Sequence, residues 1–116
     1  MNIIYGNIPS KSNCYKIITI NGHGSLAKTK GLKEYEKSFY LQVGNLRNKD
    51  ITGFFEFYID VYYPSNRSDL DNSLKCALDC LQHAKVIRND NKCIKIVAQK
   101  FIDKKEPRIE FEIKEV

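Results

Sequence analysis

Three aspartates and one lysine are the residues of this chain whose types and spacing suit phosphodiester chemistry. Asp69 and Asp71 are separated by one residue, Lys75 follows Asp71 by four residues, and Asp90 comes later in the chain. Carboxylate oxygens are ligands that Mg²⁺ prefers, and a bound divalent cation polarises a phosphate and lowers the pKa of its water. A lysine that reaches the same phosphate can stabilise the charge that develops there. The spacing therefore predicts a metal-dependent phosphodiesterase site in this segment.

A helix must follow the two aspartates, because apolar side chains recur along a single stripe over 70–81. Each helical residue turns by roughly 100°, so Asp69 and Asp71 inside one helix would point about 200° apart and could not share an ion. We therefore expect Asp69 to precede the helix and Asp71 to be its N-cap, with the helix beginning at Asn72. This arrangement puts both carboxylates on one side of the helix start, with Lys75 one turn further along.

Each of these residues also has a purely structural interpretation. Aspartates at a helix start are stabilised by the helix dipole, Asp90 lies in a turn-forming stretch, and Lys75 could be an ordinary solvated side chain. That interpretation leaves unexplained why a helix start needs two acids and an asparagine on an otherwise basic chain. On the residues alone, both interpretations stay open.

The remaining pattern predicts an α+β fold in a single domain, residues 1–116. The expected further elements are strands over 15–20, 54–63, 93–101 and 108–114 and a helix over 31–44. We expect a two-layer sandwich in which a mixed four-stranded sheet packs against two main helices, in the order β-α-β-α-β-β. The strand over 54–63 should be central, and the last two strands should form a hairpin through 103–107.

The charge distribution suits a polyanionic partner. The chain has a formal net charge of +5, and eight basic residues but only two acids lie between Lys11 and Lys49. A nuclease has to hold phosphates while keeping a cation, and a basic surface around a small negative pocket does both. An ordinary lysine-rich surface would give the same composition. The candidate phosphate contacts are Lys11, Lys16, Lys28, Lys30, Lys33 and Arg67.

The sequence gives no sign of a membrane segment or of a zinc site. No apolar run is long enough to span a bilayer, and the first residues lack the features of a secretory signal, so we expect a cytoplasmic protein. The four cysteines include no C-x-x-C pair and are interpreted as reduced structural thiols. A tetrahedral zinc site would have to draw all four cysteines from three separate elements.

The chain resembles the RusA-type Holliday junction resolvases, a family of small, mostly phage-derived crossover junction endodeoxyribonucleases. The segments that carry the resemblance are 6–15, Arg67 to Asn72, Lys75, 77–79, Leu81, Asn89 with Asp90, and 107–113. The match is most specific in the D-L-D-N-x-x-K stretch and weakest over 16–49. The family often has two adjacent aspartates where this chain has Asn89 and Asp90, so the metal-binding role is carried over to Asp90, with Asn89 as a supporting group.

The resemblance implies a function and a set of roles. Asp69, Asp71 and Asp90 would bind Mg²⁺, for which Mn²⁺ could substitute, and Lys75 would be a catalytic residue. The enzyme would act as a homodimer on branched DNA, without a small-molecule cofactor, and would leave a 5′-phosphate and a 3′-hydroxyl. Two alternatives remain: a structure-selective nuclease for flaps or forks, and a relative that binds junctions without cutting them.

Overall fold

The computed structural model describes residues 1–116, apart from the side chain of Lys11, so the phosphate contact predicted at Lys11 lies outside the described side chains. The strands are β1 (Asn2–Tyr5), β2 (Tyr15–Ile20), β3 (His23–Lys28), β4 (Phe55–Tyr63), β5 (Cys93–Ile102) and β6 (Arg108–Glu115). The helices are α1 (Lys30–Gln42) and α2 (Asp71–His83), and three short 3-10 turns are η1 (Lys11–Asn13), η2 (Gly44–Leu46) and η3 (Asp90–Lys92).

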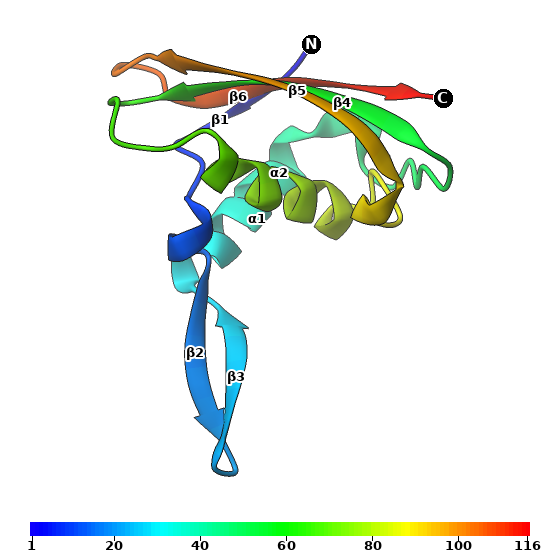
Figure 1. Ribbon diagram of the computed structural model, residues 1–116. Coiled ribbons are helices and arrows are strands. Elements are labelled where there is room, and N and C mark those ends of the chain that lie inside the picture. The colour runs from blue at the N-terminus through cyan, green and yellow to red at the C-terminus, as the bar shows by residue number, and fades with distance from the viewer.

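Four of the strands form a mixed sheet in the order β1-β6-β4-β5. β4 pairs in parallel with β5 and antiparallel with β6, which in turn pairs antiparallel with β1. Both helices lie on the same face of this sheet (Figure 1). The predicted α+β class, with two helices against a mixed four-stranded sheet, is therefore confirmed.

The alternation of β4 explains the core. Its buried residues, Phe55, Phe57, Ile59, Val61 and Tyr63, all face the helices, whereas the residues between them are half-buried on the open face. Leu32, Tyr35, Phe39 and Val43 of the α1 segment are buried against them, which confirms the apolar stripe expected there. The side chain of Thr29 accepts a hydrogen bond from the backbone N–H of Leu32 and so caps α1.

The strand expected over 15–20 exists, but it does not join the main sheet. β2 pairs only with β3, in a two-stranded hairpin that projects from the body of the molecule (Figure 1). Asn21 and Gly22 have φ angles of 49° and 79°, and positive φ at both turn residues is what a two-residue hairpin turn of this hand requires. The fourth strand of the sheet is β1, a short segment that the sequence pattern did not reveal.

The expectation that the last two strands form a hairpin is wrong. β4 lies between β5 and β6, so the connection 103–107 crosses the end of β4. Strands two positions apart are separated by about 10 Å, a distance that five residues bridge easily. The backbone N–H of Asp103 donates to the carbonyl of Tyr63 at 2.7 Å, and Arg108 forms an ion pair with Asp103 at 2.9 Å, which fixes the corner.

Within the described residues, no helix is both long enough and apolar enough to cross a membrane.

Candidate active site

Asp69 and Asp71, the acid pair, lie where β4 leads into α2. The N-cap of α2 is Leu70, whose side chain makes no capping hydrogen bond, and Asp71 is the first helical residue. The expectation that Asp71 caps the helix is therefore wrong, because Leu70 already has helical backbone angles of φ −58° and ψ −45°. Asp69 precedes the helix, as expected. Both aspartates are exposed at the end of the helix where free backbone N–H groups favour negative charge.

Buried hydroxyl groups support the acid pair from the core. The hydroxyl of Tyr63 donates to the carbonyl of Asp69 at 3.3 Å, and it lies 2.5 Å from the hydroxyl of Ser73, which is fully buried. A phenol has one proton to give, so Ser73 donates to Tyr63. Burial raises the pKa of Tyr63, the hydrogen bond from Ser73 opposes this rise, and the charges of Asp69 and Asp71 add to it.

Lys100, which the sequence did not lead us to expect here, binds the peptide group that precedes Asp69. The Lys100 ammonium donates to the carbonyl of Ser68 at 2.5 Å and lies 5.7 Å from the centre of the Tyr63 ring. Lys100 is paired with Val61 across the sheet and shares the helix-facing side of β5 with Ile96 and Ala98. A lysine at an inward position of an apolar strand was the signal that could have identified it.

Lys75 is the centre of a second cluster, further along α2. Its ammonium lies 2.7 Å from a carboxylate oxygen of Asp90 and 3.0 Å from one of Asp79. These hydrogen bonds, first that to Asp90 and then that to Asp79, raise the pKa of Lys75, so the side chain stays charged at neutral pH. The structure therefore brings together two of the four predicted catalytic residues, Lys75 and Asp90.

Asp79 connects this cluster to the base of the hairpin. The Tyr15 hydroxyl donates to the second carboxylate oxygen of Asp79 at 2.6 Å, while the first oxygen contacts Lys75. Burial and the hydrogen bond to Asp79 both raise the pKa of Tyr15, so its hydroxyl remains a proton donor. In the sequence, Asp79 entered only as part of the segment 77–79 that carries the family resemblance, and its contact with Tyr15 joins residues 64 positions apart in the chain.

Asp90 is held by its own turn and by the second half of α2. Its backbone N–H donates to the side-chain carbonyl of Gln82 at 3.0 Å, and the Asn89 side chain caps η3 by accepting from the N–H of Asn91. Figure 1 shows η3 beside one end of α2 and the loop 64–70 at the opposite end. Asp90 therefore contacts Lys75, one helical turn after Asp71, and among the described residues it does not gather with Asp69 and Asp71 into one group of acids.

The donor set suits a hard cation at the acid pair. Among the described residues, no group of three or more His, Cys, Asp or Glu side chains lies close enough together to hold a metal ion, so the three aspartates are not gathered. Mg²⁺, however, is commonly held by one or two carboxylates together with waters and substrate phosphates. Asp69 and Asp71 provide two exposed carboxylates at the start of α2, and carboxylate oxygens fit the chemistry of that ion.

The four cysteines are free thiols. Cys14, Cys76 and Cys80 are buried, and Cys93 is half-exposed. Burial, with a contribution from Cys76, raises the pKa of Cys14 to about 12, so this thiol stays protonated and unreactive at neutral pH.

The predicted phosphate contacts are spread over three places. Lys16 and Lys28 are on the hairpin, Lys30 and Lys33 are at the start of α1, and Arg67 is in the loop before Asp69; all five are exposed. Two of them have acidic partners, because Lys28 lies 3.0 Å from Glu36 and Lys30 lies 3.8 Å from Glu34.

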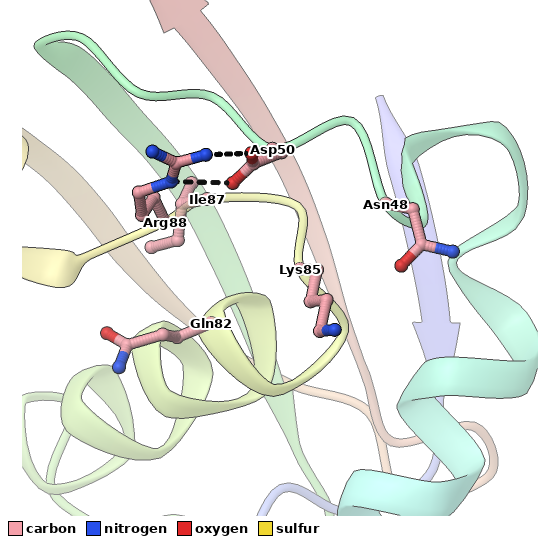
Figure 2. A pocket seen from close by; sticks show the side chains of 6 residues that line it. All are labelled: Asn48, Asp50, Gln82, Lys85, Ile87 and Arg88. Carbon is pink, nitrogen blue, oxygen red and sulfur yellow. Dashed lines mark hydrogen bonds and ion pairs between the residues drawn. The ribbon is translucent and has the colours of Figure 1, made fainter.

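A cavity of about 600 Å³ lies beyond the last turn of α2, away from the acid pair. It is lined by Asn48, Asp50, Gln82, Lys85, Ile87 and Arg88. Figure 2 shows the side chains of Arg88 and Asp50, which both line the cavity, pointing toward each other. They form paired hydrogen bonds of 2.5 and 3.2 Å. Its one link to the predicted site is Gln82, which holds the backbone of Asp90. The cavity therefore contains none of the predicted catalytic side chains.

The sequence was also compared with known proteins. The family model described as Endodeoxyribonuclease RusA matches residues 11–114. The match includes the hairpin, both helices and strands β4 to β6, with all four predicted catalytic residues, and leaves out β1. No similar protein was found among the curated proteins.

Proposed function

The chain belongs to the RusA endodeoxyribonuclease family, and we propose that it is the Mg²⁺-dependent enzyme that resolves four-way DNA junctions by paired, symmetrical strand nicks. Membership makes it a DNA-cutting hydrolase. The observation that carries the finer proposal is the layout of α2, which presents two carboxylates at its start and, one turn further, a charged lysine bound to Asp90.

Asp69 and Asp71 would hold Mg²⁺ or Mn²⁺, which when bound would polarise the scissile phosphate and supply a water of lowered pKa. Hydrogen bonds from Tyr63 and Lys100 to the backbone on either side of the Asp69 Cα support this role. Asp90 is proposed as the third ligand from its position in the family motif. Its replacement by asparagine should then raise the Mg²⁺ concentration needed for cutting.

Lys75 is suited to stabilise the charge that develops on the phosphate. An ammonium has three donors, and the contacts with Asp79 and Asp90 use two of them. The third can be given to a phosphate oxygen without breaking either contact. Because the neighbouring acids keep the lysine protonated, it acts as a fixed positive charge rather than as a base.

The basic hairpin and the start of α1 would hold the DNA arms. The hairpin strands contain Lys16 and Lys28 but no acidic residue, and Lys30 and Lys33 follow directly. Contacts of this kind release counterions, so junction affinity should fall steeply with salt, by a slope of about 0.9 per phosphate contact on a log–log plot. An affinity that does not change between low and high salt would contradict this assignment.

We further propose that two copies act together, because a four-way junction presents two symmetry-related strands that must both be cut. The proposed compartment is the cytoplasm. Sedimentation of the protein with and without a junction measures the number of copies. A monomer that makes paired nicks would argue against the dimer. The proposal also includes a phage or prophage origin, in keeping with the family.

The deciding experiment is incubation of the purified protein with a synthetic mobile four-way junction, in Mg²⁺ or in EDTA, beside the Asp71→Asn variant. Paired nicks that need Mg²⁺ and vanish in the variant would support the resolvase. A panel of flaps and forks tests the alternative nuclease, which would cut these substrates at least as fast as the junction.

One observation favours the alternative of a junction-binding protein without activity: the three aspartates are not gathered within the described residues. Tight junction binding with no cutting in Mg²⁺ or Mn²⁺ would support this alternative and would remove the catalytic roles of Asp69, Asp71, Lys75 and Asp90.

A further inference from the structure

Lys100 occupies an unusual place for a lysine. Across the sheet it is paired with Val61, which is fully buried, so its stem starts on the apolar, helix-facing side of β5. Lys100 is itself half-buried, and partial removal of an ammonium from water costs free energy unless the group finds a partner. No described carboxylate lies within ion-pair distance of Lys100, and the partner that it does have is the backbone carbonyl of Ser68, at 2.5 Å.

This hydrogen bond and one from Tyr63 connect the turn before α2 to the sheet. Lys100, from β5, donates to the carbonyl of Ser68, and Tyr63, at the end of β4, donates to the carbonyl of Asp69. Two consecutive peptide groups are thus tied to the two parallel strands of the sheet. The parallel pairing of β4 with β5 brings the two donors to the same end of the sheet. The Cα atom that carries the Asp69 side chain lies between these two peptide groups.

We propose that Lys100 is a positioning residue of the active site: its hydrogen bond to Ser68 fixes the turn that carries Asp69, so that Asp69 and Asp71 accept one divalent cation together. This inference rests on the proposed function. The long lysine stem is what lets a donor on the strand reach the turn. A short neutral donor at this position would not span the gap, and an apolar side chain would leave the carbonyl of Ser68 without this donor.

The test measures cation binding separately from cutting, with Tb³⁺ as the probe. Tb³⁺ binds carboxylates and luminesces when a nearby tyrosine transfers energy to it. The chain has seven tyrosines and no tryptophan, and the Tyr63 hydroxyl donates to the backbone carbonyl of Asp69. Titrations would compare the unmodified chain with Lys100→Met, which loses the donor, and Lys100→Arg, which keeps a long donor. Lys95→Met removes a lysine from the same strand and is the matched control, since Lys95 is exposed.

We expect Lys100→Met to weaken Tb³⁺ binding about tenfold and to raise the Mg²⁺ concentration for half-maximal nicking by a similar factor, as suits the loss of one charge-assisted hydrogen bond. Lys100→Arg should keep the Tb³⁺ affinity and the Mg²⁺ requirement close to those of the unmodified chain. Lys95→Met should change neither the Tb³⁺ affinity nor the Mg²⁺ requirement. Competition with Mg²⁺ and loss of the Tb³⁺ signal in Asp71→Asn would show that the signal comes from the acid pair.

Three results would overturn the inference. Unchanged Tb³⁺ binding in Lys100→Met would mean that the hydrogen bond does not position Asp69. Tighter binding in that variant would mean that Lys100 acts only by repelling cations. A Lys100→Arg variant that folds but binds no better than Lys100→Met would remove the role of the donor. In contrast, a lack of Tb³⁺ binding and of nicking by the unmodified chain would refute the proposed function itself, and the role of Lys100 with it.

Discussion

The two clusters along α2 are built in different ways. At the start of the helix, Asp69 and Asp71 are carried by backbone that buried groups hold, and Tyr63 and Ser73 have exposed fractions of only 1% and 0%. Further along, Lys75 is held by ion pairs, and its side chain is 48% exposed. The acid pair is therefore shaped by the hydrophobic core, whereas the lysine is placed by a balance of charges at the surface.

This difference indicates how each cluster should respond to its surroundings. Groups fixed by buried hydrogen bonds keep their geometry when salt or a ligand is added. Exposed ion pairs are screened by salt and can exchange one anionic partner for another. The acid pair thus has the fixed backbone that the proposed cation site requires, and Lys75 is exposed enough for the proposed contact with a DNA phosphate.

The largest expected effect tests to which cluster Asp90 belongs. Asp69→Asn and Asp90→Asn should each reduce Mg²⁺-dependent nicking by about 10³-fold or more, because each removes a proposed ligand, and both should retain junction binding. Single-turnover assays over a range of Mg²⁺ concentrations measure this, with Glu112→Gln on the open sheet face as the control. A much smaller loss for Asp90→Asn, with an unchanged Mg²⁺ requirement, would place Asp90 only with Lys75 and would remove it from the ligand set.

Lys75→Ala should cause the next largest loss, about 10²- to 10³-fold in turnover, because a positive charge beside the phosphate is removed. Junction affinity should stay nearly the same, since one exposed lysine among many contributes little to binding. Gel-shift and single-turnover assays separate the two quantities, and Lys114→Ala is the control. A loss of binding as large as the loss of cutting would make Lys75 a DNA contact rather than a catalytic residue.

The sequence was most informative where function and local pattern coincide. Asp69, Asp71 and Lys75 lie within one short segment, so their positions around the start of α2 could be derived from helix geometry. The buried face of β4 followed from strict alternation. The N-cap was misplaced by one residue, because Leu70 is the cap and Asp71 is already helical, although aspartate is the better capping residue.

What could not be predicted depends on contacts between distant residues. The sequence does not show which strands pair with each other, because alternation within a strand does not reveal its neighbours. The pairing of β1 with β6 and the position of β4 between the last two strands were therefore not predicted. The Asn-Gly turn after Ile20 was a local hairpin signal that the sequence interpretation did not use. The contacts of Lys75 with Asp90 and of Lys100 with Ser68 appear only once the fold brings separate elements together.

Asp79→Asn should have a smaller effect, about tenfold on turnover. Asparagine can still accept the hydrogen bond from Tyr15, but it loses the charge that helps to hold the Lys75 ammonium. The Mg²⁺ requirement should not change, in contrast to variants of the acid pair. Nicking rates at several Mg²⁺ concentrations measure both. A shifted Mg²⁺ requirement would show that the two clusters act as one site and would break the distinction drawn between them.

The smallest expected effect is on stability and compares two tyrosine hydroxyls, one in each cluster. Tyr63→Phe leaves the buried Ser73 hydroxyl without its partner, so the free energy of unfolding should fall by about 1–3 kcal/mol. Tyr15→Phe frees Asp79, which is only partly buried, to bind water, so the fall should stay below about 1 kcal/mol. Urea unfolding with unchanged slopes measures both values. Equal losses would mean that the Lys75 cluster depends on the core as much as the acid pair does.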